Sequence, residues 1–214
     1  MRVLIACEFS GIVREAFKAR GHDAWSCDLL PTEIPGKHYE CSVLDILNCD
    51  WNLMIAHPPC TYLANSGVRW LYDDKLIGFK NLDRWDKLRH SIKFFKSIFN
   101  APVPLIAVEN PIPHKYSRDG FITPVSAEII EGIGKYTQII QPWQFGHTTS
   151  KATCFWLRGL PKLKPTSIIP KEQRTFEIHR EPPGPNRQKN RSRTFQGIAD
   201  AMAEQWGVTP PRNK

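Results

Sequence analysis

The 214-residue chain lacks the long apolar segments of membrane proteins. No apolar run approaches the roughly 18 to 20 residues that a membrane-spanning helix needs. The opening stretch, residues 1–6, is too short for a signal peptide and is typical of a first strand. The sequence also shows no internal repeat. We therefore expect a cytoplasmic protein with no membrane partner.

Paired cysteines are also missing. The six cysteines show no Cys-x-x-Cys pair and no paired Cys/His clusters, and they stand at positions 7, 27, 41, 49, 60 and 154. A structural zinc site requires such pairs. We predict reduced thiols, mostly buried, and no bound metal.

Acidic residues are fewer than basic ones, and the formal net charge is +8. The excess is concentrated late in the chain, where three glutamates accompany Lys164, Lys171, Arg174, Arg180, Arg187, Lys189, Arg191 and Arg193. Such a segment favours contact with the phosphates of a nucleic acid, and a solvated loop is the alternative.

The hydrophobic pattern predicts a sheet with crossover helices. An apolar run at 2–7, helical spacing over 12–20 and a strand at 24–27 form one β-α-β unit. Further strands are expected at 52–56 and 104–108, with a long amphipathic helix over 82–99 between them. Strands that alternate with helices predict an α/β fold with a doubly wound, mostly parallel sheet.

The last third of the chain has a different pattern. Strands are expected at 136–142 and 154–157, with an antiparallel arrangement as one option, and a helix at 194–206. Residues 159–193 are basic and rich in proline and show little periodicity. We predict one α/β domain over 1–158, a loop over 159–193, and a C-terminal segment, 194–214, that packs back on the domain.

Several polar groups follow the predicted strands, where ligands bind in open α/β sheets. They are Phe9-Ser10-Gly11, Asp28, Asp45, His57-Pro58-Pro59-Cys60 and Glu109-Asn110. Asp28 lies where nucleoside-binding folds place a carboxylate for ribose hydroxyls, although a turn or N-cap aspartate is the alternative. The first turn lacks a full Gly-x-Gly-x-x-Gly, because Val13 and Arg14 occupy the later positions. An adenosine without phosphates fits this turn better than a dinucleotide.

Cys60 directly follows two prolines at a strand end. Consecutive prolines have a fixed φ and no amide donor, so they leave the sheet and stiffen the loop that carries the next side chain. A thiol held in this way is a candidate nucleophile once its pKa is lowered, and a buried structural cysteine is the alternative. Glu109 ends the next strand and is expected in the same cleft, unless it merely caps a helix.

These motifs, together with Phe145-Gly146, occur in the chain order of the DNA cytosine-5 methyltransferases. The chain resembles this family over nearly its whole length, and most closely its compact phage and prophage members. The resemblance implies a Rossmann-like fold of the class I S-adenosylmethionine (SAM)-dependent type, with SAM bound by residues 1–158. Cofactor contacts are implied for Phe9 on the adenine, Gly11 near the methionine part, Asp28 on the ribose, Leu29 against the ring, Asp45 on the adenine amino group, and Pro59.

The resemblance also implies the chemistry and the partner. The Cys60 thiolate adds to carbon 6 of cytosine, Glu109 stabilises protonation at ring nitrogen 3, and carbon 5 takes the methyl group. The partner is DNA, duplex or single-stranded, bound by a monomer. Substrate contacts are expected from His57, Asn110, Lys151, Arg187, Lys189 and Arg191. Enzymes that methylate DNA amino groups carry an aromatic after the prolines, so Cys60 favours carbon 5.

The chain departs from the family pattern at several positions. His57 replaces a small residue, Arg14 is a candidate partner for the methionine carboxylate, and Ile198 replaces an asparagine. Residues 148–153 replace a Gln-x-Arg-x-Arg segment, so that Lys151 either substitutes for one arginine or is structural.

The segment between the late motifs is too short for a target-recognition region, which predicts weak or very short sequence specificity. Two alternatives stay open. One is the same chemistry on a free pyrimidine nucleotide, and the other is a catalytically weak protein that binds SAM or DNA.

Overall fold

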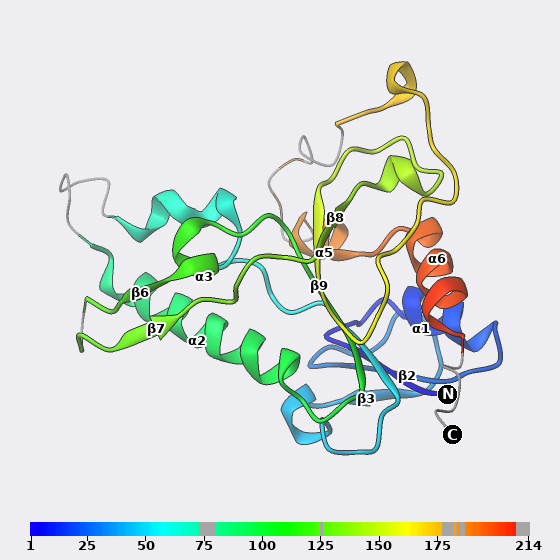
Figure 1. Ribbon diagram of the computed structural model, residues 1–214, viewed down its shortest axis with the longest axis horizontal. Coiled ribbons are helices and arrows are strands. Elements are labelled where there is room, and N and C mark those ends of the chain that lie inside the picture. Colours follow the sequence, from blue (N-terminus) through cyan, green and yellow to red (C-terminus); the bar gives the residue numbers. More distant parts are fainter. Residues whose placement is uncertain (73–79, 125, 177–181, 183, 185–186, 209–214) are drawn as a thin grey trace.

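A seven-stranded sheet forms the centre of the protein (Figure 1). The computed structural model describes all residues except 73–79, 125, 177–181, 183, 185–186 and 209–214. In spatial order the strands are β3 (His38–Glu40), β2 (Asp23–Asp28), β1 (Arg2–Ala6), β4 (Leu53–Ala56), β5 (Leu105–Asn110), β9 (Thr153–Arg158) and β8 (Gln138–Ile140). Within the described part of the chain, no helix has the length and apolar character needed to cross a membrane.

The sheet is mostly parallel, as the sequence predicts. Strands β3, β2, β1, β4 and β5 pair in parallel, and β9 runs antiparallel to both β5 and β8. From β1 the chain adds β2 and β3 on one side of the sheet, and it then returns to add β4 and β5 on the other side, so the order reverses between β1 and β4. In doubly wound sheets this reversal opens a crevice for ligands beyond the carboxyl ends of the strands.

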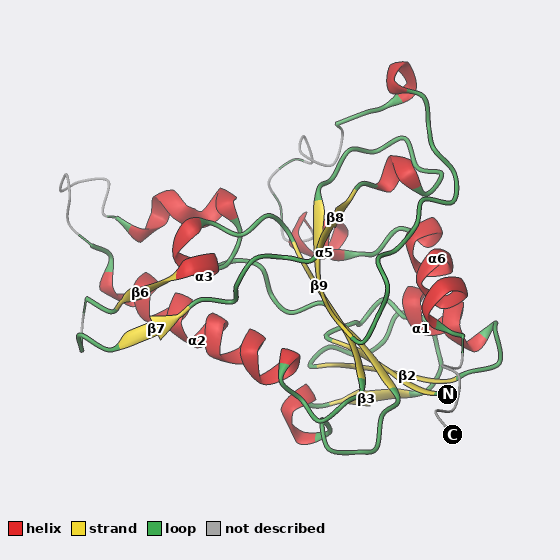
Figure 2. Cartoon of the chain, viewed as in Figure 1, coloured by secondary structure: helices red, strands yellow, loops and turns green. Residues whose placement is uncertain are grey.

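Helices cover both faces of the sheet (Figure 2). The helices described are α1 (Ile12–Lys18), α2 (Leu82–Phe99), α3 (Lys115–Asp119), α5 (Arg187–Ser192) and α6 (Gln196–Trp206). Of these, α1 and α6 cover one face of the sheet and α2 covers the other. Single 3-10 turns or short 3-10 helices occur at η1 (Val43–Asp45), η2 (Asn65–Leu71), η3 (Pro142–Gln144) and η4 (Lys171–Gln173). In β1, Val3 and Ile5 join the core under α1 and α6, whereas Leu4 and Ala6 join the core under α2. This alternation explains why the strand is apolar throughout.

Helix α2 has the bounds that the sequence predicts. The side chain of Asn81 caps it by accepting from the backbone N–H of Arg84 at 3.1 Å. Trp85, Leu88, Ile92 and Phe95 follow at helical spacing and are all buried. The apolar stripe therefore fixes this helix against the sheet.

Three other segments were not expected. Strands β6 (Gly120–Ile122) and β7 (Ile129–Glu131) form a hairpin that lies beside α3 and the N-terminal half of α2 (Figure 1). Helix α5 lies within the segment that we predicted to be a loop. We did not predict it because six residues are too few to show a helical period in the sequence. Arg180, which belongs to the predicted basic segment, lies outside the described residues.

Arg14 is completely buried and ties α1 to the segment after β2. Its guanidinium donates to the hydroxyls of Ser26 and Thr32, at 2.8 and 3.1 Å, and to the carbonyl of Ile34. A Cβ atom at Gly11 would lie 2.8 Å from Arg14 Nη2, so glycine is needed there for the chain's own packing. Arg14 was also a candidate partner for a methionine carboxylate, and in the structure its buried guanidinium instead donates to groups of the fold.

We expect Arg14→Ala to lower the free energy of unfolding by about 3 kcal/mol, because it removes several buried hydrogen bonds and leaves a cavity. Urea denaturation measures the change. Arg20→Ala, in the same part of the chain but partly exposed, is the control and should change the stability by about 0.5 kcal/mol or less. A similar small effect for Arg14→Ala would contradict the structural role of this guanidinium.

Candidate active site

A cavity of about 1180 Å³ opens at the carboxyl ends of β1, β4 and β5. One wall comes from Cys7 to Ser10 after β1, from His57 to Thr61 after β4, and from Glu109 to Ile112 around the end of β5. Residues of η2, of α5 and of the segments that flank α5 also line the cavity. The cavity therefore lies at the reversal of strand order, where the fold predicts a ligand site.

The turn that carries Cys60 is anchored at both ends. The N–H of His57 donates to the carbonyl of Ala6 at 2.9 Å, and Asn110 Nδ2 donates to the carbonyl of Pro58 at 2.9 Å. After the prolines, the Cys60 carbonyl accepts from the N–H groups of Leu63 and Ala64. Cys60 is the one exposed cysteine of the six, and it lines the cavity. The two prolines thus restrict the conformation of the turn that carries the accessible Cys60 thiol.

The structure brings Glu109 to the same cavity and pairs it with His57. His57 Nδ1 lies 3.2 Å from Glu109 Oε2, and the two side chains are 9% and 18% exposed. Burial alone would raise the pKa of Glu109. The hydrogen bond and charge of His57, together with the charge of Lys151, outweigh burial and hold that pKa below its usual value.

The Cys60 thiol is not activated in the ligand-free protein. Solvent reaches the residue, yet protein atoms crowd its surroundings, and this burial raises the pKa of Cys60. The negative charge of Glu109 raises it further, while Lys151 and Arg191 act in the opposite direction. Cys60 is therefore a protonated thiol at neutral pH in the ligand-free protein, first because of burial and second because of the Glu109 charge.

Glu8 also lines the cavity, and the sequence reasoning missed it. It is 4% exposed, and its Oε1 accepts from Val13 N at 2.8 Å and from Ser10 Oγ at 3.1 Å. Burial raises the pKa of Glu8 against the opposing effects of His57 and these donors. The available signal was an acidic residue directly after an apolar strand.

The expected cofactor residues do not all reach the cavity. Phe9 and Pro59 line it, whereas Gly11, Asp28, Leu29 and Asp45 do not. Asp28 Oδ1 accepts from Leu30 N at 3.0 Å, as in the alternative of a turn aspartate, and no hydrogen bond from the described residues reaches its second oxygen.

The outlying cofactor candidates differ in their surroundings. Leu29 is 74% exposed and Asp45 is exposed, so both lie at the surface beside the strand ends. Gly11 faces Arg14 and Ile34 of its own chain at the place where we expected a ligand.

Lys189 has a different environment from the expected phosphate contact. Its Nζ lies 2.9 Å from Glu33 Oε1 and 5.2 Å from the centre of the Phe9 ring. Arg193 also binds Glu33, at 2.7 and 3.0 Å, and the hydrogen bonds and charges of both cations lower the pKa of Glu33 to about 2. Lys189 therefore holds α5 against the segment after β2, outside the cavity lining.

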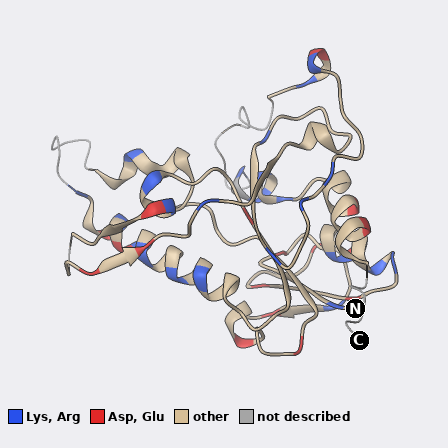
Figure 3. Ribbon diagram, viewed as in Figure 1, with Lys and Arg blue, Asp and Glu red and all other residues tan. Residues whose placement is uncertain are grey.

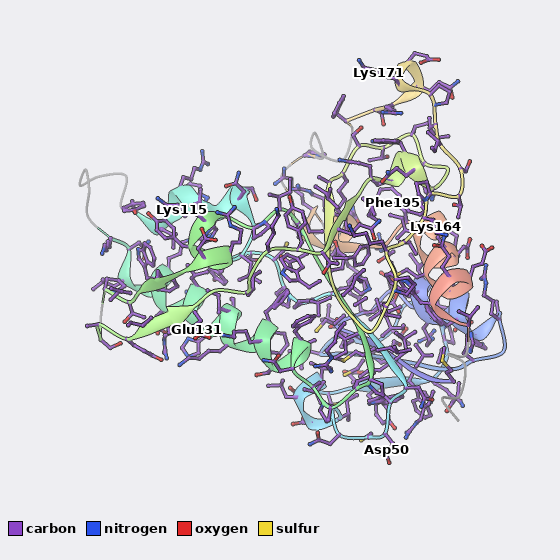
Figure 4. All side chains as sticks on the ribbon, viewed as in Figure 1. Asp50, Lys115, Glu131, Lys164, Lys171 and Phe195 are labelled. Atoms are coloured by element: carbon purple, nitrogen blue, oxygen red, sulfur yellow. The ribbon has the colours of Figure 1, made fainter. Side chains whose placement is uncertain are left out.

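The other expected substrate residues line the cavity. They are His57, Asn110, Lys151, Arg187 and Arg191. Lys151 Nζ donates to the carbonyl of Arg191 at 2.7 Å, so this lysine is structural as well as a source of positive charge. Basic residues recur on α5 and along α2 (Figure 3). Lys171, by contrast, lies at the tip of an extension and does not line the cavity (Figure 4).

Aromatic side chains at the rim were not predicted. Trp70 is 43% exposed and Phe176 is 60% exposed, and both line the cavity. The guanidinium of Arg69 lies 4.3 Å from the centre of the Trp70 ring. Arg84 also lines the cavity. Exposed rings beside guanidinium groups form surfaces on which nucleobases can stack.

No family model and no curated protein sequence matches the chain. Among solved structures it is similar to a candidate DNA modification methyltransferase encoded within an E. coli prophage, with 16% sequence identity and a TM-score of 0.45. The match covers 78% of this chain and 51% of that one, so the chain spans about half the length of that protein.

We expect Glu109→Gln to speed alkylation of Cys60 by iodoacetamide several-fold near pH 8. Loss of the carboxylate charge lowers the pKa of Cys60, so the rise in rate with pH moves to lower pH. Lys151→Met should slow the reaction for the opposite reason. The measurement is mass spectrometry of the Cys60 peptide over time.

Glu131→Gln provides the matched control, because Glu131 is exposed and does not line the cavity. Its alkylation rate should equal that of the unaltered protein. Equal rates for Glu109→Gln and the unaltered protein would show that Glu109 does not control the thiol.

Proposed function

We propose that the protein is a SAM-dependent methyltransferase that acts on carbon 5 of cytosine in DNA, with low or very short sequence specificity. One observation carries the proposal. An exposed cysteine on a proline-stiffened turn shares a cavity with the partly buried carboxylate of Glu109, at the reversal of strand order in a doubly wound sheet. A class I methyltransferase fold is part of this proposal.

The cavity residues fit the chemistry of a pyrimidine ring. Carbon 5 of cytosine is a weak nucleophile, and covalent addition of Cys60 Sγ at carbon 6 divides one difficult step into easier ones. Glu109 stabilises a proton at ring nitrogen 3, so that negative charge does not accumulate on the ring. That proton also offsets the Glu109 charge, which is the main charge opposing thiolate formation at Cys60.

The strand ends beside the cavity fit the adenosine of SAM. Phe9 offers an aromatic ring at the end of β1, and Asp28 keeps one carboxylate oxygen without a hydrogen bond from the described residues at the end of β2. Phe9 would lie on the adenine and Asp28 would accept from the ribose hydroxyls. Lys189, which lies over Phe9, would have to share or yield that ring. When bound, SAM supplies the methyl group.

The walls of the cavity favour a nucleic acid over a free nucleotide. Its volume of about 1180 Å³ exceeds the range of about 300 to 1,000 Å³ that is usual for small-molecule sites. Trp70 and Phe176 are available for stacking, and Arg84, Arg187 and Arg191 supply positive charge. A base of duplex DNA would have to leave the helix to reach Cys60.

A catalytically weak protein that binds SAM or DNA is the second candidate. It is favoured by the raised pKa of Cys60 and by the position of Lys189 over the Phe9 ring. The two candidates differ in whether any substrate becomes methylated.

Incubation with tritiated SAM separates them. We expect label in DNA, and little in dCMP, when duplex DNA, single-stranded DNA and dCMP are offered separately. Cys60→Ser should abolish transfer and retain SAM binding, because it removes the nucleophile alone. Cys49→Ser, outside the cavity, is the control. Label in dCMP only would refute a DNA substrate, and absence of label from every substrate would favour the binding protein.

Affinity for DNA tests the rim of the cavity. We expect Trp70→Ala to raise the Kd for a single-stranded oligonucleotide about tenfold, because stacking contributes about 1 to 3 kcal/mol per base. Binding should depend little on sequence and should weaken as salt rises. Fluorescence anisotropy measures both effects. Trp25→Ala, whose ring stacks on Tyr39 outside the cavity, is the control. An unchanged Kd for Trp70→Ala would exclude this ring from the binding surface.

A further inference from the structure

Three ionisable side chains meet where β1, β4 and β5 end side by side. Glu8 follows β1, His57 follows β4, and Glu109 belongs to β5. All three line the cavity. Glu8 and His57 are almost completely buried, and His57 Nδ1 is hydrogen-bonded to Glu109 Oε2 at 3.2 Å. A positive charge on His57 lowers the pKa of Glu8 as well as that of Glu109, so the imidazole interacts with both carboxyl groups.

The second ring nitrogen of His57 has no partner. Nε2 is buried, and no atom of the described residues forms a hydrogen bond with it. A buried polar atom without a partner costs free energy, so such atoms are rare and often mark functional positions. The unpaired buried oxygens of Asn110 and Gln141 belong to residues that line the same cavity. His57 is thus held by one nitrogen, while the other is not committed to the fold.

The two carboxyl groups beside His57 are driven in opposite directions. Burial raises the pKa of Glu8 even though His57 opposes it, whereas His57 and Lys151 together overcome burial and lower the pKa of Glu109. Pairs of groups with pKa values driven apart in this way identify an acid and a base within one site. Glu8 is suited to hold a proton and Glu109 to receive one.

We propose that His57, supported by Glu8, holds a proton beside Glu109 and passes it through Glu109 to ring nitrogen 3 of the bound pyrimidine. This inference rests on the proposed function. His57 and Glu8 are positioning residues, because they act through Glu109. Such a chain allows a carboxylate that is ionised in the free protein to serve as the donor to the ring.

The addition step balances in atoms and charge. Cys60 first gives its Sγ proton to water, which reaches this exposed residue. The thiolate then forms the bond from Sγ to carbon 6, and the electron pair of the bond between carbons 5 and 6 moves into the ring. Nitrogen 3 takes a proton from Glu109, and Glu109 takes the Nδ1 proton of an imidazolium at His57. The adduct is then neutral, His57 is neutral, and Glu109 is again a carboxylate. A proton from Glu8 or from water restores the imidazolium.

Other charged groups that act on the cavity do not exchange protons in this range. Lys151 and Arg191 act on the Cys60 thiol, and Lys151 acts on Glu109. Cys60 ionises at a higher pH than the carboxyl groups of the proposed proton chain, because burial and Glu109 raise the pKa of its thiol. A donor that must carry a proton limits the rate as pH rises, so a levelling or fall of the rate below the range in which Cys60 ionises reports on Glu8, His57 and Glu109.

His57→Asn is the decisive variant. Its amide can still donate from near the Nδ1 position to Glu109, but it cannot exchange a proton. We expect single-turnover methyl transfer at saturating oligonucleotide to fall about a hundredfold, and its rate to rise with pH between about pH 5.5 and 9 without the levelling or fall that loss of the His57 proton imposes on the unaltered protein. His90→Asn, on the exposed surface, is the control.

A second measurement does not depend on catalysis. Nitrogen-15 NMR of labelled histidines follows the ring nitrogens of His57 with pH. We expect its titration curve to shift in Glu8→Gln and in Glu109→Gln, and to stay unchanged in Glu131→Gln. Thermal melting checks that each variant is folded.

The outcomes separate the two proposals. A His57→Asn variant with the rate and pH profile of the unaltered protein overturns the proton chain and leaves the methyltransferase intact. Lack of methyl transfer by the unaltered protein refutes the proposed function. The NMR titration then tests whether His57 is coupled to Glu8 and Glu109. A His57 titration that does not change in Glu8→Gln overturns it.

Discussion

The parallel register of β1, β4 and β5 is the constraint on which the site depends. Ala6 pairs with Ala56, and Ala56 pairs with Val108, so the residues that follow β1 and β4 come beside Glu109 near the end of β5. Residues that follow them, far apart in the sequence, are delivered to one cavity. A slip of one residue in β4 would reverse the side chains of that strand and separate His57 from Glu109. The geometry of the cavity and the packing of the core therefore depend on the same strand pairing.

The sequence allowed much of this to be predicted. Buried parallel strands are apolar throughout, and α2 has a clear cap and stripe, so sheet, helix and strand-end residues could be placed. The proline pair indicated Cys60, and the next strand end indicated Glu109. Both side chains line the cavity, whereas the roles given to them are still a proposal.

Other features depended on contacts that no local pattern encodes. Arg14 is polar and was expected to meet a ligand, yet several acceptors on a neighbouring segment allow its burial. Lys189 was expected at a phosphate and instead binds Glu33, over 150 residues earlier in the chain. Glu8 was missed because its raised pKa comes from burial among residues that are distant in sequence. The sequence shows which residues are charged, but it does not show which residues they pair with in the folded protein.

The ion pairs of Glu33 with Lys189 and Arg193 bear on how the cavity is assembled. They join residues near the two ends of the chain, and loop-closure entropy opposes such long-range contacts until the intervening segments have folded. A chain still emerging from the ribosome holds Cys60 and Glu109 well before α5 exists. During synthesis, Cys60 and Glu109 are therefore present before α5 can complete the cavity that they line.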